Sequence, residues 1–204
     1  MTDQNRKIIL ASGSKTRAML LKNAGITASI DPSRIDEDAV KQAFLADDGS
    51  LSPADMASLL AEAKAIDVAA RHPGSLVIGA DQTLEFEGEL FSKAATIGNV
   101  RQNLLSMRGK PHLLHAAAVI AHEGAVIERI EASATLTFRD FSPEFLGRYL
   151  ASVGDAALSS VGGYQLEGEG LQLFESIDGD FFTVLGMPLL PLIAALRRHR
   201  GLDT

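Results

Sequence analysis

The chain has 204 residues, of which 46% are hydrophobic, and its formal net charge of −7 gives a pI near 5.2. This length suits one well-packed domain, and an acidic chain without Trp lacks the basic face and the stacking platforms that nucleic-acid binding requires. The polar start at residues 1–5, the absence of Cys and the lack of an apolar run of ~18–20 residues predict a cytoplasmic protein with no disulfides, no secretory signal and no membrane partner.

The first predicted elements are a short strand over residues 8–11 and a helix over residues 16–25, joined by a polar loop. Ser12, Ser14 and Arg17 place two hydroxyls and a cation where the amides of a helix start point outward, which is typical of a phosphate site. The alternative is a helix capped by serine, with Arg17 on its surface. The loop matches neither a Walker A sequence nor a glycine-rich dinucleotide fingerprint, so it indicates an anion without naming it.

Strand-like and helix-like patterns then alternate along the chain. They predict a strand over 26–30, an acidic turn over 36–38, a helix over 39–46, a loop over 47–50 and a helix from 52–53 to about residue 70. Ser52 and Pro53 mark the start of this long helix, because serine caps helices and proline is favoured in the first turn.

Asp81 closes an apolar run over residues 76–80 that predicts a buried strand. Ligands of open α/β sheets bind at the carboxyl ends of strands, where a carboxylate can hold a divalent cation or orient a water molecule. Capping a turn is the alternative role for Asp81. Glu37, in the acidic turn, is a candidate second metal ligand, and its alternative is a solvated surface charge.

The second half of the chain contains longer strand-like runs. The patterns predict a hairpin around 87–88, a helix over 97–107, strands over 113–121 and 126–138 joined by a hairpin turn, a helix over 143–152, a glycine-rich loop over 162–170, a strand over 171–177 and a final helix over 189–199. Strands and helices alternate early and a hairpin lies in the middle, so we expect an α/β fold with a mixed twisted sheet in a single domain over residues 1–204.

Three further charged residues indicate a function only when they are considered together with the other motifs. Lys64 on the long helix, Lys93 in a loop and Glu167 in the glycine-rich loop are each ordinary surface charges when taken singly. The five histidines show no metal-ligand spacing, so we expect structural roles for them. No Gly-x-Ser-x-Gly turn occurs, which disfavours an α/β-hydrolase.

Taken together, the ordered motifs resemble the Maf family of nucleoside triphosphate pyrophosphatases. The residues that carry the resemblance are Leu10-Ala11-Ser12-Gly13-Ser14-Lys15-Thr16-Arg17, Ile35-Asp36-Glu37, Lys64-Ala65, Ile78-Gly79-Ala80-Asp81-Gln82, Ser92-Lys93-Ala94, Gly162-Gly163-Tyr164-Gln165-Leu166-Glu167-Gly168, Ile177-Asp178-Gly179-Asp180 and Val184-Leu185-Gly186-Met187-Pro188-Leu189. No single motif decides the resemblance, but the ordered set covers nearly the whole chain and is specific.

The resemblance implies a fold of two lobes flanking a cleft, like that of inosine triphosphate pyrophosphatases, and usually a homodimer. It also implies that water attacks the α-phosphorus of a nucleoside triphosphate and releases a monophosphate and pyrophosphate, with Mg2+ or Mn2+ as the cofactor. Such hydrolysis spreads negative charge that cations and a metal ion stabilise. The implied class is therefore a hydrolase of nucleotide metabolism that acts on acid anhydrides.

Residue roles follow from the same resemblance. Asp81 is implied to be the acid that activates water or holds the metal, and Glu37 is implied to assist with the cation. The residues implied to grip the triphosphate are Arg17, Lys64 and Lys93, with hydrogen bonds from Ser12 and Ser14.

Several residues depart from the family pattern, and they bear on which nucleotide base the protein is expected to bind. Thr16 stands where dTTP/UTP-type members have Arg and 7-methyl-GTP-type members have Trp, so it fits neither group. Gln82 and Glu167 match the 7-methyl-GTP type, and a carboxylate at Glu167 could accept hydrogen bonds from a guanine edge or favour a cationic methylated base. Lys15 and Ala94 replace prolines of the family, and Ala94 loosens its loop. We therefore expect 7-methyl-GTP or another modified nucleotide as the substrate.

Other functions stay open at this point. One is a non-catalytic nucleotide-binding regulator of septum formation and cell division, and another is a pyrophosphatase that prefers dTTP or UTP. Retention of Asp81, Lys64, Lys93 and Arg17 favours an enzyme, because a pure interaction protein has no need of this set. A sugar-phosphate or other phosphate-ester enzyme is disfavoured by the ordered motifs.

Overall fold

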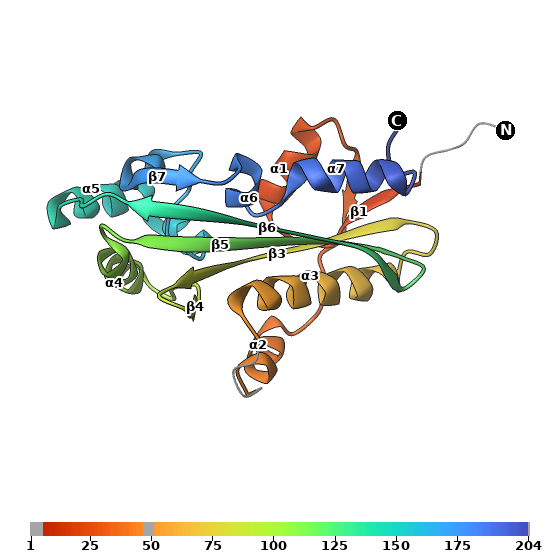
Figure 1. Ribbon diagram of the computed structural model, residues 1–204, viewed down its shortest axis with the longest axis horizontal. Helices are drawn as coiled ribbons and strands as arrows, with labels where there is room; N and C mark the ends of the chain where they lie inside the picture. The colour runs from red at the N-terminus through yellow and green to blue at the C-terminus, as the bar shows by residue number, and fades with distance from the viewer. Residues whose placement is uncertain (1–5, 47–50, 204) are drawn as a thin grey trace. The chain divides into compact units, whose positions relative to one another are not determined.

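The fold is a mixed α/β sheet with helices, as the sequence predicts (Figure 1). A computed structural model describes residues 6–46 and 51–203 of the chain. Within these residues, seven strands form one sheet in the order β2-β1-β3-β5-β6-β7, and β4 pairs with β3. β1 pairs in parallel with β2 and β3, whereas the β3–β4 and β6–β7 pairs are antiparallel. Parallel pairing requires crossover connections, which α1, α2 and α3 provide.

The elements have the following bounds in chain order. The strands are β1 (Ile8–Leu10), β2 (Ala28–Ile30), β3 (Leu76–Phe86), β4 (Glu89–Phe91), β5 (Pro111–His122), β6 (Ala125–Phe138) and β7 (Phe174–Asp178). The helices are α1 (Lys15–Asn23), α2 (Glu37–Ala46), α3 (Pro53–Ala69), α4 (Ile97–Met107), α5 (Pro143–Val153), α6 (Phe181–Val184) and α7 (Leu189–Arg198), with 3-10 turns η1 (Gly154–Ser159) and η2 (Glu169–Leu173). In the part of the chain that the structure describes, no helix is long and apolar enough to cross a membrane.

The chain forms two compact units. Unit 1 comprises Met1–Gln82, His115–Ala132 and Phe181–Thr204, and unit 2 comprises Thr83–Leu114 and Ser133–Asp180. The strands β3, β5 and β6 each contribute residues to both units. The expected single domain over residues 1–204 and the expected cleft between two lobes stay predictions.

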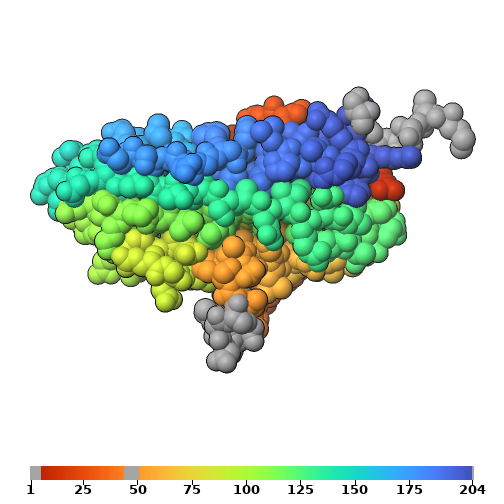
Figure 2. Space-filling model, viewed as in Figure 1, coloured from red at the N-terminus to blue at the C-terminus, as the bar shows by residue number. Residues whose placement is uncertain are grey.

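One apolar core of unit 1 lies between the sheet and the helices α1 and α7 (Figure 1). Leu10, Ile78 and Ile120 from the strands pack with Leu21 of α1 and Leu192 of α7. The outer side of α7, dark blue in Figure 2, lies at the surface of the molecule. Strand side chains alternate between faces, so the neighbours of these strand residues point to the opposite side of the sheet.

The opposite face of the same strands packs against α3 (Figure 1). Ile9, Val77 and Val119 are buried there together with Ala61 and Ala65 of the helix. Alanine adds little bulk, so α3 can lie close to the strands. Unit 1 is therefore a sheet covered by helices on both faces, which is the arrangement that buried parallel strands require.

Unit 2 has an aromatic core instead. The ring of Phe138 lies 4.7 Å from the ring of His112 and 4.8 Å from that of Phe174, measured between centroids. Nε2 of His112 lies 2.7 Å from the hydroxyl oxygen of Tyr164. Its Nδ1 is buried without a hydrogen-bond partner among the described residues, and burial lowers the pKa of His112 to about 4. His112 is therefore neutral near pH 7, which agrees with the structural role expected for it.

Helix starts follow the capping residues of the sequence. Ser14, Ser52, Thr96 and Ser142 precede α1, α3, α4 and α5, and each hydroxyl accepts a hydrogen bond from the amide three residues later. Such a bond satisfies one of the amides that a helix start leaves without a partner. The predicted starts of these helices are confirmed to within a residue.

The predicted end of the strand at Asp81 was wrong. β3 continues to Phe86, so Asp81 lies inside the strand and not after it. The strand continues because the later residues pair with β4, with Leu84 opposite Phe91. The buried apolar run ends at Ala80, but the hydrogen-bonded ladder does not.

Further boundaries differ from the prediction: β2 begins at Ala28 and α1 ends at Asn23, each two residues from the predicted position. α2 begins at Glu37, because Oδ1 of Asp36 accepts hydrogen bonds from the amides of Asp38 and Ala39 and so begins the helix. Residues 171–173 form a 3-10 turn, and β7 begins only at Phe174. The predicted loop over 47–50 lies outside the described residues.

Candidate active site

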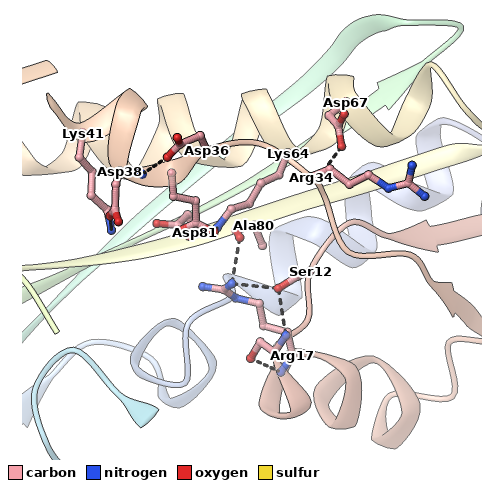
Figure 3. Close-up of polar contacts among 12 residues, drawn as sticks. Ser12, Arg17, Arg34, Asp36, Asp38, Lys41, Lys64, Asp67, Ala80 and Asp81 are labelled. Carbon is pink, nitrogen blue, oxygen red and sulfur yellow. Dashed lines mark hydrogen bonds and ion pairs between the residues drawn. The ribbon is translucent and has the colours of Figure 1, made fainter. Parts of the chain in front are cut away.

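Lys64 lies at the centre of an ionic cluster in unit 1. Its Nζ lies 2.6 Å from Oδ1 of Asp81 and 2.8 Å from Oε1 of Glu37. The Lys64 side chain from α3 and the Asp81 side chain from β3 point toward each other (Figure 3). Their side chains are only 7% and 12% exposed, so both charges are largely withdrawn from water. The structure thus brings together three of the predicted site residues, with two carboxylates on one ammonium group.

Gly79 explains how the helix and the strand come close enough for this cluster. A Cβ at Gly79 would overlap the carbonyl oxygen of Ala61 and lie 2.7 Å from the amide nitrogen of Ala65. Residues two apart on a strand face the same side, so Asp81 faces α3 as Gly79 does. Lys64, three residues after Ala61 on that helix, therefore reaches Asp81 directly.

Arg17 connects three separate segments of unit 1. Its Nε donates a hydrogen bond to the carbonyl oxygen of Gly186 at 2.9 Å. Its Nη1 donates to the carbonyl oxygen of Ala80 at 2.9 Å (Figure 3). Burial lowers the pKa of Arg17, whereas the charges of Asp81 and Glu37 raise it. Arg17 is therefore a half-buried cation that interacts electrostatically with the carboxylates of Asp81 and Glu37.

The first polar loop is a capped helix start. The hydroxyl of Ser14 accepts a hydrogen bond from the amide of Arg17 at 3.3 Å. The hydroxyl of Ser12, which is buried, accepts from the amide of Ser14 at 3.3 Å and from Nη1 of Arg17 at 3.2 Å. Capping by Ser14 is therefore confirmed, but Arg17 is partly buried on backbone carbonyl groups and does not lie on the helix surface. Contact of these hydroxyls with a phosphate stays a prediction.

Gln82 and Thr16 were predicted to influence which base is bound. Nε2 of Gln82 donates hydrogen bonds to the carbonyl oxygens of Thr183 and Val184, at 2.9 and 3.0 Å. This amide therefore holds the end of α6 beside β3. Thr16 is the second residue of α1 and is partly buried. A role of either residue in choosing the base stays a prediction.

Lys93 and Glu167 belong to unit 2. Lys93 follows β4 in an irregular segment, and Glu167 lies in a turn just before η2. Both residues are exposed. The cluster of Lys64, Glu37 and Asp81 is assembled within unit 1, so a contribution from Lys93 or Glu167 stays a prediction.

The acidic pair Glu37 and Asp81 fits a divalent cation. Mg2+ takes oxygen ligands and is commonly held by one or two carboxylates, with substrate phosphates and water as further ligands. Within residues 6–46 and 51–203, no group of three or more His, Asp or Glu is placed to hold a metal ion. These two carboxylates therefore suit a cation that arrives with a phosphate ligand better than a permanent structural metal.

Sequence reasoning missed Asp67 and Arg71, which lie on or just after the helix that carries Lys64. Oδ2 of Asp67 accepts a hydrogen bond from the amide of Arg34 at 2.9 Å, just before the segment that leads to Glu37. The signal was present as the spacing of Lys64, Asp67 and Arg71 by three and four residues, which puts them on one face of a helix. A single sequence does not show which strand or loop that face contacts.

Comparison with known proteins shows which family and which relatives this chain is similar to. Residues 7–199 match the family described as "Maf-like protein". A protein of Brucella suis named 7-methyl-GTP pyrophosphatase is 51% identical over 197 residues, which are 97% of this chain and 98% of the relative. A protein of Caulobacter vibrioides named nucleoside triphosphate pyrophosphatase is 49% identical over 195 residues, 96% of each chain.

A further relative and one solved structure complete the comparison. A Mesorhizobium japonicum protein, also named 7-methyl-GTP pyrophosphatase, is 50% identical over 197 residues, with 97% of this chain and 98% of the relative covered. A nucleoside-triphosphatase / dITP/XTP pyrophosphatase of Mycobacterium abscessus is 15% identical, covers 72% of this chain and 94% of its own, and has a TM-score of 0.36, too distant to bear on the site. On the match over residues 7–199 and the relatives along nearly its whole length, the chain belongs to the Maf family.

Proposed function

We propose that this protein is a nucleoside triphosphate pyrophosphatase, a hydrolase that converts a nucleoside triphosphate to the monophosphate and pyrophosphate. The observation that carries the proposal is the cluster of Lys64 with Glu37 and Asp81, at 2.8 and 2.6 Å. Relatives matched over 96–97% of this chain are named 7-methyl-GTP pyrophosphatase and nucleoside triphosphate pyrophosphatase, which supports the proposal.

In the proposed reaction, water attacks the α-phosphorus. A bond forms between the water oxygen and phosphorus, and the bond from the α-phosphorus to the bridging oxygen of the β-phosphate breaks. The electron pair of the broken bond leaves with pyrophosphate, and the monophosphate keeps the water oxygen. In this proposal Asp81 orients the water and takes its proton, which is the role of a general base.

The cations have a separate task in this proposal. Lys64 and Arg17 offset the negative charge that spreads over the phosphate oxygens as the bond breaks, and Lys93 adds a further cation. A Mg2+ or Mn2+ ion held by Asp81 and Glu37 would supply additional positive charge to the phosphate oxygens. The hydroxyls of Ser12 and Ser14 add hydrogen bonds to the triphosphate.

The proposed substrate is 7-methyl-GTP or another modified nucleotide. Gln82 and Glu167 support this choice, because both match the 7-methyl-GTP type of the family. Two relatives about half identical to this chain carry that name. A homodimer in the cytoplasm completes the proposal, and light scattering after size-exclusion chromatography tests the dimer.

The experiment is pyrophosphate release from dTTP, UTP, CTP, GTP and 7-methyl-GTP with Mg2+ or Mn2+. We expect release from 7-methyl-GTP to exceed that from the others, and Asp81→Asn to lower kcat by about 100-fold or more, because it removes a general base and a metal ligand. Asp140→Asn is the matched control, since Asp140 is 79% exposed and pairs with Arg108 at 2.9 Å in unit 2. Reaction in 18O-labelled water should place the label in the monophosphate.

Each other outcome decides against a part of the proposal. Nucleotide binding without pyrophosphate release from any substrate would favour the non-catalytic regulator. Preference for dTTP or UTP would overturn the choice of substrate and keep the reaction. Unchanged activity of Asp81→Asn would overturn the role given to Asp81. Label in pyrophosphate would overturn attack at the α-phosphorus.

A further inference from the structure

The face of α3 that carries Lys64 also carries Asp67, one turn further along. Oδ2 of Asp67 accepts hydrogen bonds from the amide of Arg34 and from Nη1 of Arg71, both at 2.9 Å (Figure 3 shows the first). The hydrogen bond from the Arg34 amide, followed by that from Arg71, lowers the pKa of Asp67. A charged carboxylate therefore joins α3 to the backbone of residues 31–36.

Arg71 and His72 hold the beginning of the same segment. Nη2 of Arg71 donates to the carbonyl oxygen of Pro32 at 3.4 Å, and its Nε lies 3.4 Å from Oδ2 of Asp31. Nε2 of His72 lies 2.7 Å from the same oxygen of Asp31. Three side chains at the end of α3 thus contact the segment between β2 and α2.

The other end of this segment determines where Glu37 lies. Asp36 begins α2 by accepting hydrogen bonds from the amides of Asp38 and Ala39, at 3.1 and 3.0 Å. Glu37 is the first residue of that helix. Its side chain is 43% exposed, whereas that of Lys64 is 7% exposed, so packing confines Lys64 far more than Glu37. The backbone that carries Glu37 therefore contributes to keeping its side chain on Lys64.

We propose that Asp67 and Arg71 are positioning residues of the active site: by holding residues 31–36 against α3, they keep Glu37 on Lys64. This inference rests on the proposed function for its kinetic part only. Neither residue contacts Lys64, Glu37 or Asp81 in the hydrogen bonds and ion pairs described above, so each acts on the cluster through the segment it holds.

The kinetic test compares Asp67→Ala with a control on the same helix. Glu62 also lies on α3 and makes an exposed ion pair, with Nη2 of Arg129 at 2.7 Å, but it does not hold residues 31–36. We expect Asp67→Ala to lower kcat for pyrophosphate release by about tenfold and to raise the half-saturating Mg2+ concentration by about fivefold, as coupling between neighbouring residues allows. Asp67→Asn, which keeps an acceptor for the Arg34 amide, should recover part of the loss, and Glu62→Ala should stay within about twofold of the unaltered protein.

A labelling cycle tests the same inference without turnover. The rate at which an N-hydroxysuccinimide ester acylates Lys64, followed by mass spectrometry, reports how well Glu37 covers its amine. We expect faster labelling in Asp67→Ala and in Glu37→Ala, and no further increase when the two are combined. Glu62→Ala should label as the unaltered protein does.

The outcomes separate the inference from the proposed function. If the unaltered protein releases no pyrophosphate, the proposed function fails and the labelling cycle still decides the inference. If Asp67→Ala matches Glu62→Ala in labelling, or if the Asp67 and Glu37 effects on labelling simply multiply, the inference is overturned whatever the activity. Circular dichroism confirms that the variants compared are folded.

Discussion

The two units of this protein differ in how they bury polar groups. In unit 1, the buried ammonium of Lys64 has two carboxylate partners, and aliphatic side chains fill both faces of the sheet. In unit 2, His112 is 1% exposed among aromatic rings, and its Nδ1 lacks a hydrogen-bond partner among the described residues. A buried charge is tolerated when an opposite charge pairs with it. A buried imidazole without a charged partner avoids the free-energy cost of desolvation by staying neutral. Unit 1 can therefore carry charge-dependent chemistry, while unit 2 makes stability depend on pH.

Among the changes that test this difference between the units, Gly79→Ala in unit 1 should have the largest effect on the free energy of unfolding. The new Cβ would meet the backbone of α3 at Ala61, which cannot rotate away as a side chain can. We expect the free energy of unfolding to fall by more than about 3 kcal/mol, at the upper end for overpacked sites. Urea unfolding followed by circular dichroism measures it. A loss below about 1 kcal/mol would show that α3 can move away from β3 without cost.

The second effect concerns pH and belongs to unit 2. Burial lowers the pKa of His112 from 6.5 to about 4, so the unfolded chain binds a proton at this residue before the folded one does. The contribution of His112 to the free energy of unfolding is complete above pH 6.5, falls as the pH drops toward 4 and levels off below pH 4. The total loss is about 3 kcal/mol.

His112→Gln isolates this effect from the carboxylates that titrate in the same range. The difference in unfolding free energy between the unaltered protein and His112→Gln should shrink as the pH falls from 7 to 4, because only the histidine gains a proton. Urea unfolding at several pH values measures the difference. A difference that does not change with pH would mean that His112 is not desolvated as the structure indicates.

The smallest effect should come from Gly98→Ala in unit 2, the counterpart of the change at Gly79. Gly98 is an exposed residue of α4, and a Cβ there would have only the Thr96 hydroxyl within 4 Å, at 3.7 Å. Alanine is the better helix former and restricts the unfolded chain, so we expect a gain of about 0.5 kcal/mol. A loss of stability on urea unfolding would contradict the open space found at this position.

Local patterns predicted most of the fold, because capping residues and apolar periodicity act over a few positions. Ser52 with Pro53 and Ser142 with Pro143 begin α3 and α5 as predicted. The predicted hairpin around 87–88 is confirmed, but a strand end was predicted at Asp81, whereas β3 runs from Leu76 to Phe86 without a break. Strand ends that are set by a partner strand cannot be read from one segment alone.

The site was predictable to the same degree. The order of the motifs singled out Lys64, Glu37 and Asp81, and the structure places them within ion-pair distance. The geometry of Asp67 and Arg71 was not predictable, because their partners are backbone groups and a short acidic residue about 30–40 positions away. Backbone acceptors and donors occur at every position, so they leave no signature in the residue types.

The ties made by Arg17 and Gln82 also have a consequence for the order in which the protein assembles. Arg17 reaches the carbonyl oxygen of Gly186, and Gln82 reaches those of Thr183 and Val184, so residues near the start and the middle of the chain are bound to a late segment. During synthesis, Arg17 and Gln82 cannot form these hydrogen bonds until residues 183–186 have left the ribosome. The first loop therefore leaves the ribosome before residues 183–186 and reaches its final surroundings only after they have emerged.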